Sequence, residues 1–108
     1  MKRLEHDLQV QVVNVLRNYY HMLVFAVPNG GSRNAIEARN LKLEGALSGV
    51  SDLIIVTKNK VFFIELKVGK NKQQQSQVDF GQKIKELGHT YFVCRSVEEV
   101  LKCLNLRY

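Results

Sequence analysis

Two acidic side chains and a lysine lie inside two neighbouring apolar runs of the sequence. Asp52 opens the first run, and Glu65 and Lys67 come near the end of the second. Side chains alternate between the faces of a strand, so Glu65 and Lys67 point to the same side. Charged groups are rarely placed in such runs unless something pairs them. Two neighbouring acids repel each other, and a hard divalent ion such as Mg²⁺ prefers oxygen ligands of this kind. The residue types therefore indicate a cation site.

The residues between the two runs predict how the acids meet. Lys58-Asn59-Lys60 is typical of a hairpin turn. If its first two residues form the loop, Asp52 falls directly opposite Glu65, and a register shift of one residue is the alternative. A simpler interpretation also remains open. In it, Asp52 caps the entry of its strand, while Glu65 and Lys67 form a solvated ion pair on an exposed face.

Length and composition predict one domain, residues 1–108, because a chain of 108 residues leaves no room for a second. Its 45% hydrophobic content suffices for a single core. No apolar run approaches the ~18 residues that a membrane span needs. The charged N-terminal residues are not those of a secretory signal. We therefore expect a cytoplasmic globular domain.

The formal net charge is +6, from 16 basic and 10 acidic residues, which favours a polyanionic partner. No aromatic residues are interleaved with the basic ones as on a base-stacking surface, and there is no zinc-finger or leucine-zipper pattern. If the partner is nucleic acid, we expect its phosphate backbone to be the main target. The basic residues that fall around the central hairpin are Lys58, Lys60, Lys67, Lys70 and Lys72.

The two cysteines, Cys94 and Cys103, fall on elements that we expect to be buried, and they lack C-x-x-C spacing. We expect reduced thiols in the core rather than a disulfide or a zinc site.

Hydrophobic periodicity predicts the order helix, strand, helix, strand, strand, helix, strand, helix. A strand-helix-strand crossover calls for at least one parallel pair, and strands that are apolar throughout need helices on both faces. The expected fold class is therefore α/β, a small mixed sheet flanked by helices. The helices are expected at 5–20, 34–44, 74–87 and 96–104, and the strands at 22–27, 53–56, 61–67 and 90–95.

Two of these helices have an inner face that the three-or-four spacing predicts. For the first helix it consists of Leu4, Leu8, Val12, Val13, Leu16 and Tyr20. For the third helix it consists of Val78, Phe80, Ile84 and Leu87.

Several further polar residues have both a functional and a structural interpretation. Glu5 stands at the start of the first helix, where an acid also simply suits the helix dipole. The loop 28–32 has backbone amides suited to phosphate, yet it could be a plain connection. Gln77 belongs to a glutamine-rich helix start that could contact phosphate or water, or serve only as a polar first turn. We expect DNA contacts from Asn29, Gly30, Arg33, Lys70 and Lys72.

Asp52 followed by Glu65-Leu66-Lys67 fits the D…(D/E)-x-K pattern of restriction-endonuclease-like nucleases. With the surrounding sequence, the chain resembles the VRR-NUC (virus-type replication-repair nuclease) domain nearly end to end. That family usually has proline where this chain has Ser51. The substitution removes a backbone constraint and no ligand, so we expect activity to survive. The stretches that carry the resemblance are Val27–Gly31, Gly45–Ile54, Phe63–Lys67, Gln77 with Gly88, and Phe92-Val93.

The resemblance implies a restriction-endonuclease-like core and a role for each matching residue. Asp52 and Glu65 become the carboxylate ligands of Mg²⁺ or Mn²⁺, the carbonyl of Leu66 completes the inner shell, and Glu5 becomes a candidate ligand, direct or through water. Lys67 positions and polarises the attacking water, or stabilises the charge on the phosphate.

Gln77 matches the family's helix glutamine, and the resemblance implies that it orients Lys67, water or the phosphate. The implied activity is a structure-selective DNA endonuclease that cleaves branched DNA, such as four-way (Holliday) junctions, as a homodimer. Three alternatives remain: a nuclease for flaps or other branched DNA, a non-catalytic DNA-binding module, and a nuclease-fold subunit for protein assembly.

Overall fold

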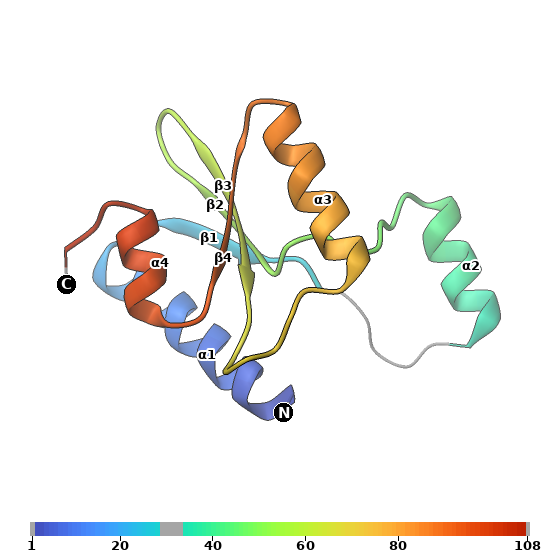
Figure 1. Ribbon diagram of the computed structural model, residues 1–108, viewed down its shortest axis with the longest axis horizontal. Coiled ribbons are helices and arrows are strands. Elements are labelled where there is room, and N and C mark those ends of the chain that lie inside the picture. Colours follow the sequence, from blue (N-terminus) through green and yellow to red (C-terminus); the bar gives the residue numbers. More distant parts are fainter. Residues whose placement is uncertain (1, 29–33, 108) are drawn as a thin grey trace.

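The computed structural model describes residues 2–28 and 34–107, and its elements follow the predicted order (Figure 1). Four helices and four strands are present in this part of the chain, with one π-helical turn after the first helix. None of the described helices is both long and apolar enough to cross a membrane. The elements are α1 (Lys2–Asn14), η1 (Val15–Tyr19), β1 (Leu23–Ala26), α2 (Ala35–Leu43), β2 (Leu53–Val56), β3 (Val61–Leu66), α3 (Gln75–Glu86), β4 (Thr90–Cys94) and α4 (Val97–Cys103).

The four strands form one mixed sheet in the order β1-β2-β3-β4. β1 pairs with β2 and β2 with β3 in antiparallel fashion, whereas β3 and β4 are parallel. The parallel pair follows from the connection through α3, because a crossover helix returns the chain to the end of the sheet from which it started. The expected mixed α/β fold is confirmed.

The β2–β3 hairpin has the register that the turn residues predict. Leu53 lies opposite Ile64 and Val56 opposite Val61, and the Thr57 N–H donates to the Lys60 carbonyl at 2.8 Å. Continuing this register by one residue sets Asp52 opposite Glu65.

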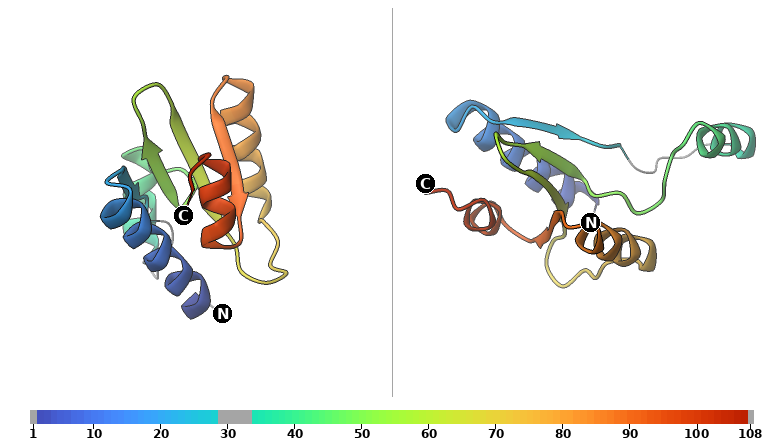
Figure 2. Two further views of the ribbon diagram at one scale, coloured as in Figure 1. Left: turned by 90° about the vertical axis from the view of Figure 1, so that its left-hand side faces the viewer. Right: turned by 90° about the horizontal axis from the view of Figure 1, so that it is seen from above.

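One face of the sheet forms the main core. Its alternating side chains, among them Ile55, Ile64 and Cys94, are 0% exposed. They pack against residues of α1, η1 and α4, such as Leu16 and Val100, which are equally buried. Figure 2 shows α3 on the other side of the sheet from α4. Since Glu65 alternates with Ile64, its side chain lies on the face that α3 covers.

The first helix departs from the prediction at both ends. Leu8 and Leu16 are buried as expected, but Leu4 is 57% exposed. From Val15 onward the helix widens into the π turn η1, which the even spacing did not indicate. Leu16 in this turn belongs to the core, and the Arg17 guanidinium donates to the Val24 carbonyl at 2.9 and 3.2 Å, which links η1 to β1.

The inner face predicted for α3 is partly wrong, because Val78 and Leu87 are 39% and 63% exposed. The helix instead turns its one buried residue, Gly81, toward the ring of Tyr91. A Cβ on Gly81 would lie only 2.5 Å from that ring, so the absent side chain permits the close approach. Phe80 lies beside it and makes an edge-to-face contact with Tyr91 at 6.1 Å between ring centres.

Helix α2 stands apart from the rest of the fold (Figure 1). It forms locally: the Asn34 side chain accepts from the Glu37 N–H at 2.8 Å, and Gly45 follows the helix with φ +107°. None of its residues is buried. Helices lie on both faces of the sheet as expected, but α2 covers neither face and leaves its apolar residue Ile36 72% exposed.

The two cysteines are free thiols, Cys94 buried at the end of β4 and Cys103 half-buried on α4. Their Sγ atoms are 3.7 Å apart, a proximity that their sequence spacing did not indicate. Burial, followed by the neighbouring Cys103, raises the pKa of the Cys94 thiol well above its usual range.

Candidate active site

Asp52 is held at the end of the β2–β3 hairpin by a hydrogen bond to the backbone. Its Oδ2 accepts the Leu66 N–H at 2.7 Å, so the carboxylate reaches across to the strand that carries Glu65. The residue before it, Ser51, is completely buried, and its hydroxyl lies 3.4 Å from the Leu53 carbonyl. Ser51, which stands where the resembling family usually has proline, is therefore packed inside the protein at the entry to β2.

Glu65 is a buried carboxyl, 1% exposed, with its two oxygens in different surroundings. Oε2 accepts a hydrogen bond from Gln77 Nε2 at 3.1 Å and lies 4.0 Å from Lys67 Nζ. Oε1 is buried without a hydrogen-bond partner. Burial raises the pKa of Glu65 to about 8, and the neighbouring Asp52 adds to the rise, while the Lys67 charge lowers it. The folded protein therefore buries a carboxyl group whose charged form lacks a full set of polar partners.

Gln77 has its amide orientation set by the start of α3. The side-chain Oε1 accepts the Gln74 N–H at 2.8 Å, as part of a capping box. With the carbonyl oxygen so engaged, the amide NH₂ is the end that faces Glu65. Among the described residues, the partner of this NH₂ is therefore Glu65 rather than Lys67.

Gly49 fixes the distance between the Asp52 loop and α3. A Cβ at this residue would lie 2.2 Å from the Ser76 carbonyl oxygen and 2.8 Å from the Gln77 nitrogen. Its φ of +83° is in the left-handed region that favours glycine. The loop that delivers Asp52 thus packs directly on the helix start that delivers Gln77.

Tyr91 and Gln73 also belong to the surroundings of the acids, and sequence reasoning missed this role for both. Gln73 Nε2 donates to the Tyr91 hydroxyl at 2.8 Å, and Tyr91 is 6% exposed. Burial, and then the charges of Glu65 and Asp52, raise the pKa of Tyr91 above its usual range. The phenol therefore stays protonated. Gln73 and Tyr91 are far apart in sequence, and the pairing of β3 with β4 brings their segments together.

The geometry fits a hard divalent cation held between Asp52 and Glu65. Two carboxylates meet there, and the Glu65 oxygen that lacks a partner is a natural ligand for Mg²⁺ or Mn²⁺. The Leu66 N–H faces Asp52, and in an antiparallel pair a residue's N–H and C=O point to the same neighbouring strand. The Leu66 carbonyl is therefore on the same side of β3 as Asp52.

Glu5 stands further from this pair. Within residues 2–28 and 34–107, no three His, Cys, Asp or Glu side chains form a group that could hold a metal. Glu5 is half-buried in the first turn of α1, and its charge is the smallest of the causes that raise the pKa of Glu65. Glu5 therefore acts on the site as a charge more distant than Asp52.

The predicted DNA contacts fall in two places. Lys70 and Lys72 are exposed in the loop after β3, close in sequence to Lys67. The Arg95 guanidinium supports this loop by donating to the Gly69 carbonyl at 2.9 Å. The remaining predicted contacts, Asn29, Gly30 and Arg33, lie outside the described residues.

Solved structures of VRR-NUC domains share this fold. One, described as a VRR_NUC domain protein, has a TM-score of 0.76 and 19% identity, and the match covers 94% of this chain and 85% of that one. A second, described as a VRR_NUC domain, has a TM-score of 0.68 and 20% identity, over 97% of this chain and 98% of that one. No protein-family model and no curated protein matches the sequence. The chain therefore has the fold of these VRR-NUC domains.

Proposed function

We propose that this chain is a metal-dependent DNA endonuclease of the VRR-NUC type, which hydrolyses phosphodiester bonds in branched DNA such as four-way junctions. The observation that carries the proposal is the buried Glu65 carboxyl, which has one oxygen without a partner and lies beside Asp52 and Lys67. A chain that only bound DNA would have no use for buried acids at a surface meant for phosphate. The shared fold supports the same conclusion.

Each site residue has a distinct part in the reaction. Asp52 and Glu65 would hold Mg²⁺ or Mn²⁺, which supplies positive charge beside the phosphate and lowers the pKa of coordinated water. Gln77 keeps Glu65 Oε2 in place, which leaves Oε1 for the cation. The Leu66 N–H holds one oxygen of Asp52 in the same way.

Lys67 is the group that we assign to the phosphate and the attacking water. Lys67 is 7% exposed, and its ammonium group is 4.0 Å from Glu65 Oε2. An ammonium so placed can orient a water molecule for in-line attack and stabilise the negative charge that grows on the phosphate oxygens. Lys70 and Lys72, in the following loop, attract the DNA backbone without reading its sequence.

A homodimer suits both the substrate and the exposed helix α2. A four-way junction is symmetric, and a C₂ dimer presents two sites to it. Helix α2 and the segment after it keep Ile36, Leu43 and Leu47 between 61% and 76% exposed. An isolated helix of nine residues is marginal in water, so α2 gains stability if a second copy covers these side chains.

The function is tested with labelled four-way junctions, flaps and linear duplexes incubated with Mg²⁺, Mn²⁺ or EDTA. We expect cleavage of the junction with either metal and none with EDTA. Asp52→Asn, Glu65→Gln and Lys67→Met should each lower the rate by about 10²–10⁴-fold. The matched control Asp79→Asn changes an exposed acid on α3 and should leave the rate unchanged. Junction binding without cleavage in any metal would instead indicate a non-catalytic DNA-binding module.

The dimer is tested by sedimentation equilibrium at micromolar concentration. We expect a mass of two chains, and a mass of one chain after Ile36→Asp and Leu43→Asp are combined. Lys42→Asp, on the same helix but without loss of an apolar side chain, serves as the control. A single-chain mass for the unaltered protein that still cleaves junctions would exclude the homodimer.

A further inference from the structure

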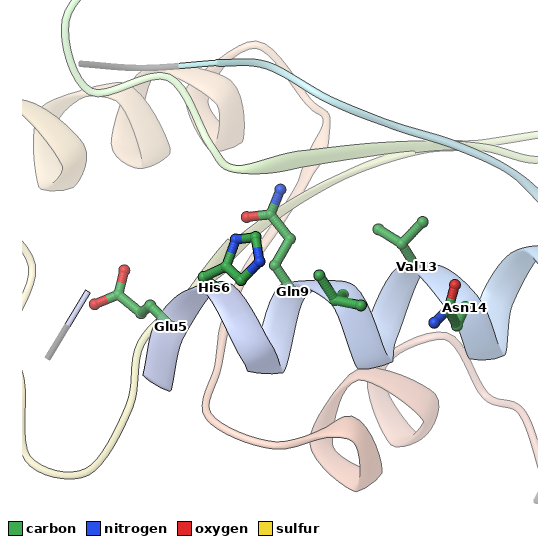
Figure 3. A pocket seen from close by; sticks show the side chains of 6 residues that line it. Glu5, His6, Gln9, Val13 and Asn14 are labelled. Carbon is green, nitrogen blue, oxygen red and sulfur yellow. The ribbon is translucent and has the colours of Figure 1, made fainter. Parts of the chain in front are cut away.

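A groove runs along α1, and no step of the proposed reaction uses it. Its volume is about 440 Å³. Figure 3 shows that the lining side chains all come from α1, with His6, Gln9 and Val13 projecting toward the side on which the strands are drawn. The residues that line it are Glu5, His6, Gln9, Val10, Val13 and Asn14.

The chemistry of this lining suits a nucleobase and not a phosphate. The described lining residues include no lysine or arginine, and Glu5 would repel an anion. Val10 and Val13 offer apolar surface to the flat face of a ring. The amides of Gln9 and Asn14 can both donate and accept, as the hydrogen-bonding edge of a base requires. Half-open grooves of several hundred Å³ with a few polar groups are typical of small-ligand sites.

One end of the groove lies near the candidate active site. Glu5 lines its N-terminal end, and the same side chain acts electrostatically on Glu65. α1 also packs against β3, the strand that carries Glu65. A nucleotide next to the scissile phosphate would therefore lie within reach of both the α1 groove and the candidate active site.

We propose that the α1 groove holds one unpaired base of the DNA, next to the phosphate that is cut. This inference rests on the proposed nuclease function and specifies its substrate. In a continuous duplex every base is paired and stacked, so none is free to enter the groove. Near a branch point or a bulge, a base unstacks at little cost. The groove thus selects branched DNA through an unpaired base rather than through its sequence.

Photo-cross-linking tests where the unpaired base lies, in the presence of EDTA and therefore without cleavage. A DNA duplex with one bulged 5-iodouracil is irradiated with the full-length protein and digested with trypsin. Cleavage after Arg3 and Arg17 gives one peptide, residues 4–17, that contains all six lining residues. We expect the cross-link on this peptide, at a yield at least tenfold above that of the same base when paired. Cross-links confined to other peptides, or equal yields from the two DNAs, would overturn the proposal.

A binding measurement under the same conditions compares Gln9→Ala with Gln11→Ala. Both glutamines are on α1, but Gln11 is exposed and does not line the groove. A base contact contributes on the order of tenfold in affinity. Gln9→Ala should therefore weaken binding of the bulged duplex about tenfold and leave the paired duplex unchanged, while Gln11→Ala changes neither. Equal losses for both DNAs, or none, would contradict the proposal. Cross-linking and binding as expected, with no metal supporting cleavage, would refute only the nuclease function.

Discussion

Replacing Glu65 by glutamine should stabilise the metal-free protein at high pH. Glutamine keeps the size and the hydrogen-bonding oxygen of Glu65 but carries no charge. In the folded protein, burial and the neighbouring Asp52 raise the pKa of Glu65 from 4.5 to about 8. Between these two values the folded state binds a proton that the unfolded state has released. The free energy of unfolding of the unaltered protein therefore falls as the pH rises from about 4.5 to about 8.

The size of the effect follows from the same two values. One pKa unit corresponds to about 1.4 kcal/mol, so ionised Glu65 costs the folded state on the order of 4–5 kcal/mol above pH 8. For a domain of this length, 1 kcal/mol moves Tm by roughly 4 °C. Glu65→Gln should then raise Tm by roughly 10–20 °C at pH 9, and by little at pH 4, where the carboxyl is protonated in both states.

Calorimetry in EDTA from pH 4 to pH 9 measures the difference directly, and Glu86→Gln, which alters an exposed carboxylate on α3, is the matched control. Because the other titratable groups are the same in the unaltered protein and in Glu65→Gln, the quantity to compare across pH is the difference between the Tm values of these two proteins. Saturating Mg²⁺ should raise the Tm of the unaltered protein at pH 8 and change that of Glu65→Gln far less, since the ion offsets the buried charge. A Tm difference that does not grow with pH would refute the account of Glu65.

Further predictions concern the residues that support the site. In urea titrations, Gly49→Ala should lower the free energy of unfolding by about 2 kcal/mol more than Gly45→Ala does. Both glycines have a positive φ, but only Gly49 lies against another stretch of backbone. Equal losses of stability in the two variants would argue against the close packing of the Asp52 loop on α3. Tyr91→Phe removes the hydroxyl that Gln73 binds and should cost about 1 kcal/mol in the same assay, so an unchanged midpoint would contradict that hydrogen bond. Mild treatment with peroxide should oxidise the Cys94 and Cys103 thiols to an intrachain disulfide. Mass spectrometry of the intact protein would show this as a loss of two hydrogens. Cys103→Ser should abolish this mass change, and a disulfide mass change that persists in the variant would contradict the pairing with Cys94.

The sequence predicts the hairpin well because local chemistry determines it. A two-residue turn at Lys58-Asn59 leaves one register for the apolar runs on either side, and this register alone sets Asp52 opposite Glu65. The helix starts at Asn34 and Ser96 are likewise local, since each side chain accepts the N–H three residues on.

Contacts between distant elements could not be predicted in this way. The spacing of apolar residues assigned Val78 to the inner face of α3, but the absence of a side chain at Gly81 lets the helix turn a different face to Tyr91. Gln77 could be recognised as a site residue, yet its partner Glu65 depends on where the helix start meets β3. No local signal distinguishes a helix that projects, such as α2, from one that packs on the sheet.

The central claim is that Asp52 and Glu65 together bind a divalent cation beside Lys67. The most direct test is anomalous diffraction from crystals grown with Mn²⁺. We expect a manganese peak within coordinating distance of Asp52 and of Glu65 Oε1, the oxygen that now has no partner. A crystal saturated with Mn²⁺ that shows no ion between these two carboxylates, or shows them turned apart, would contradict the claim.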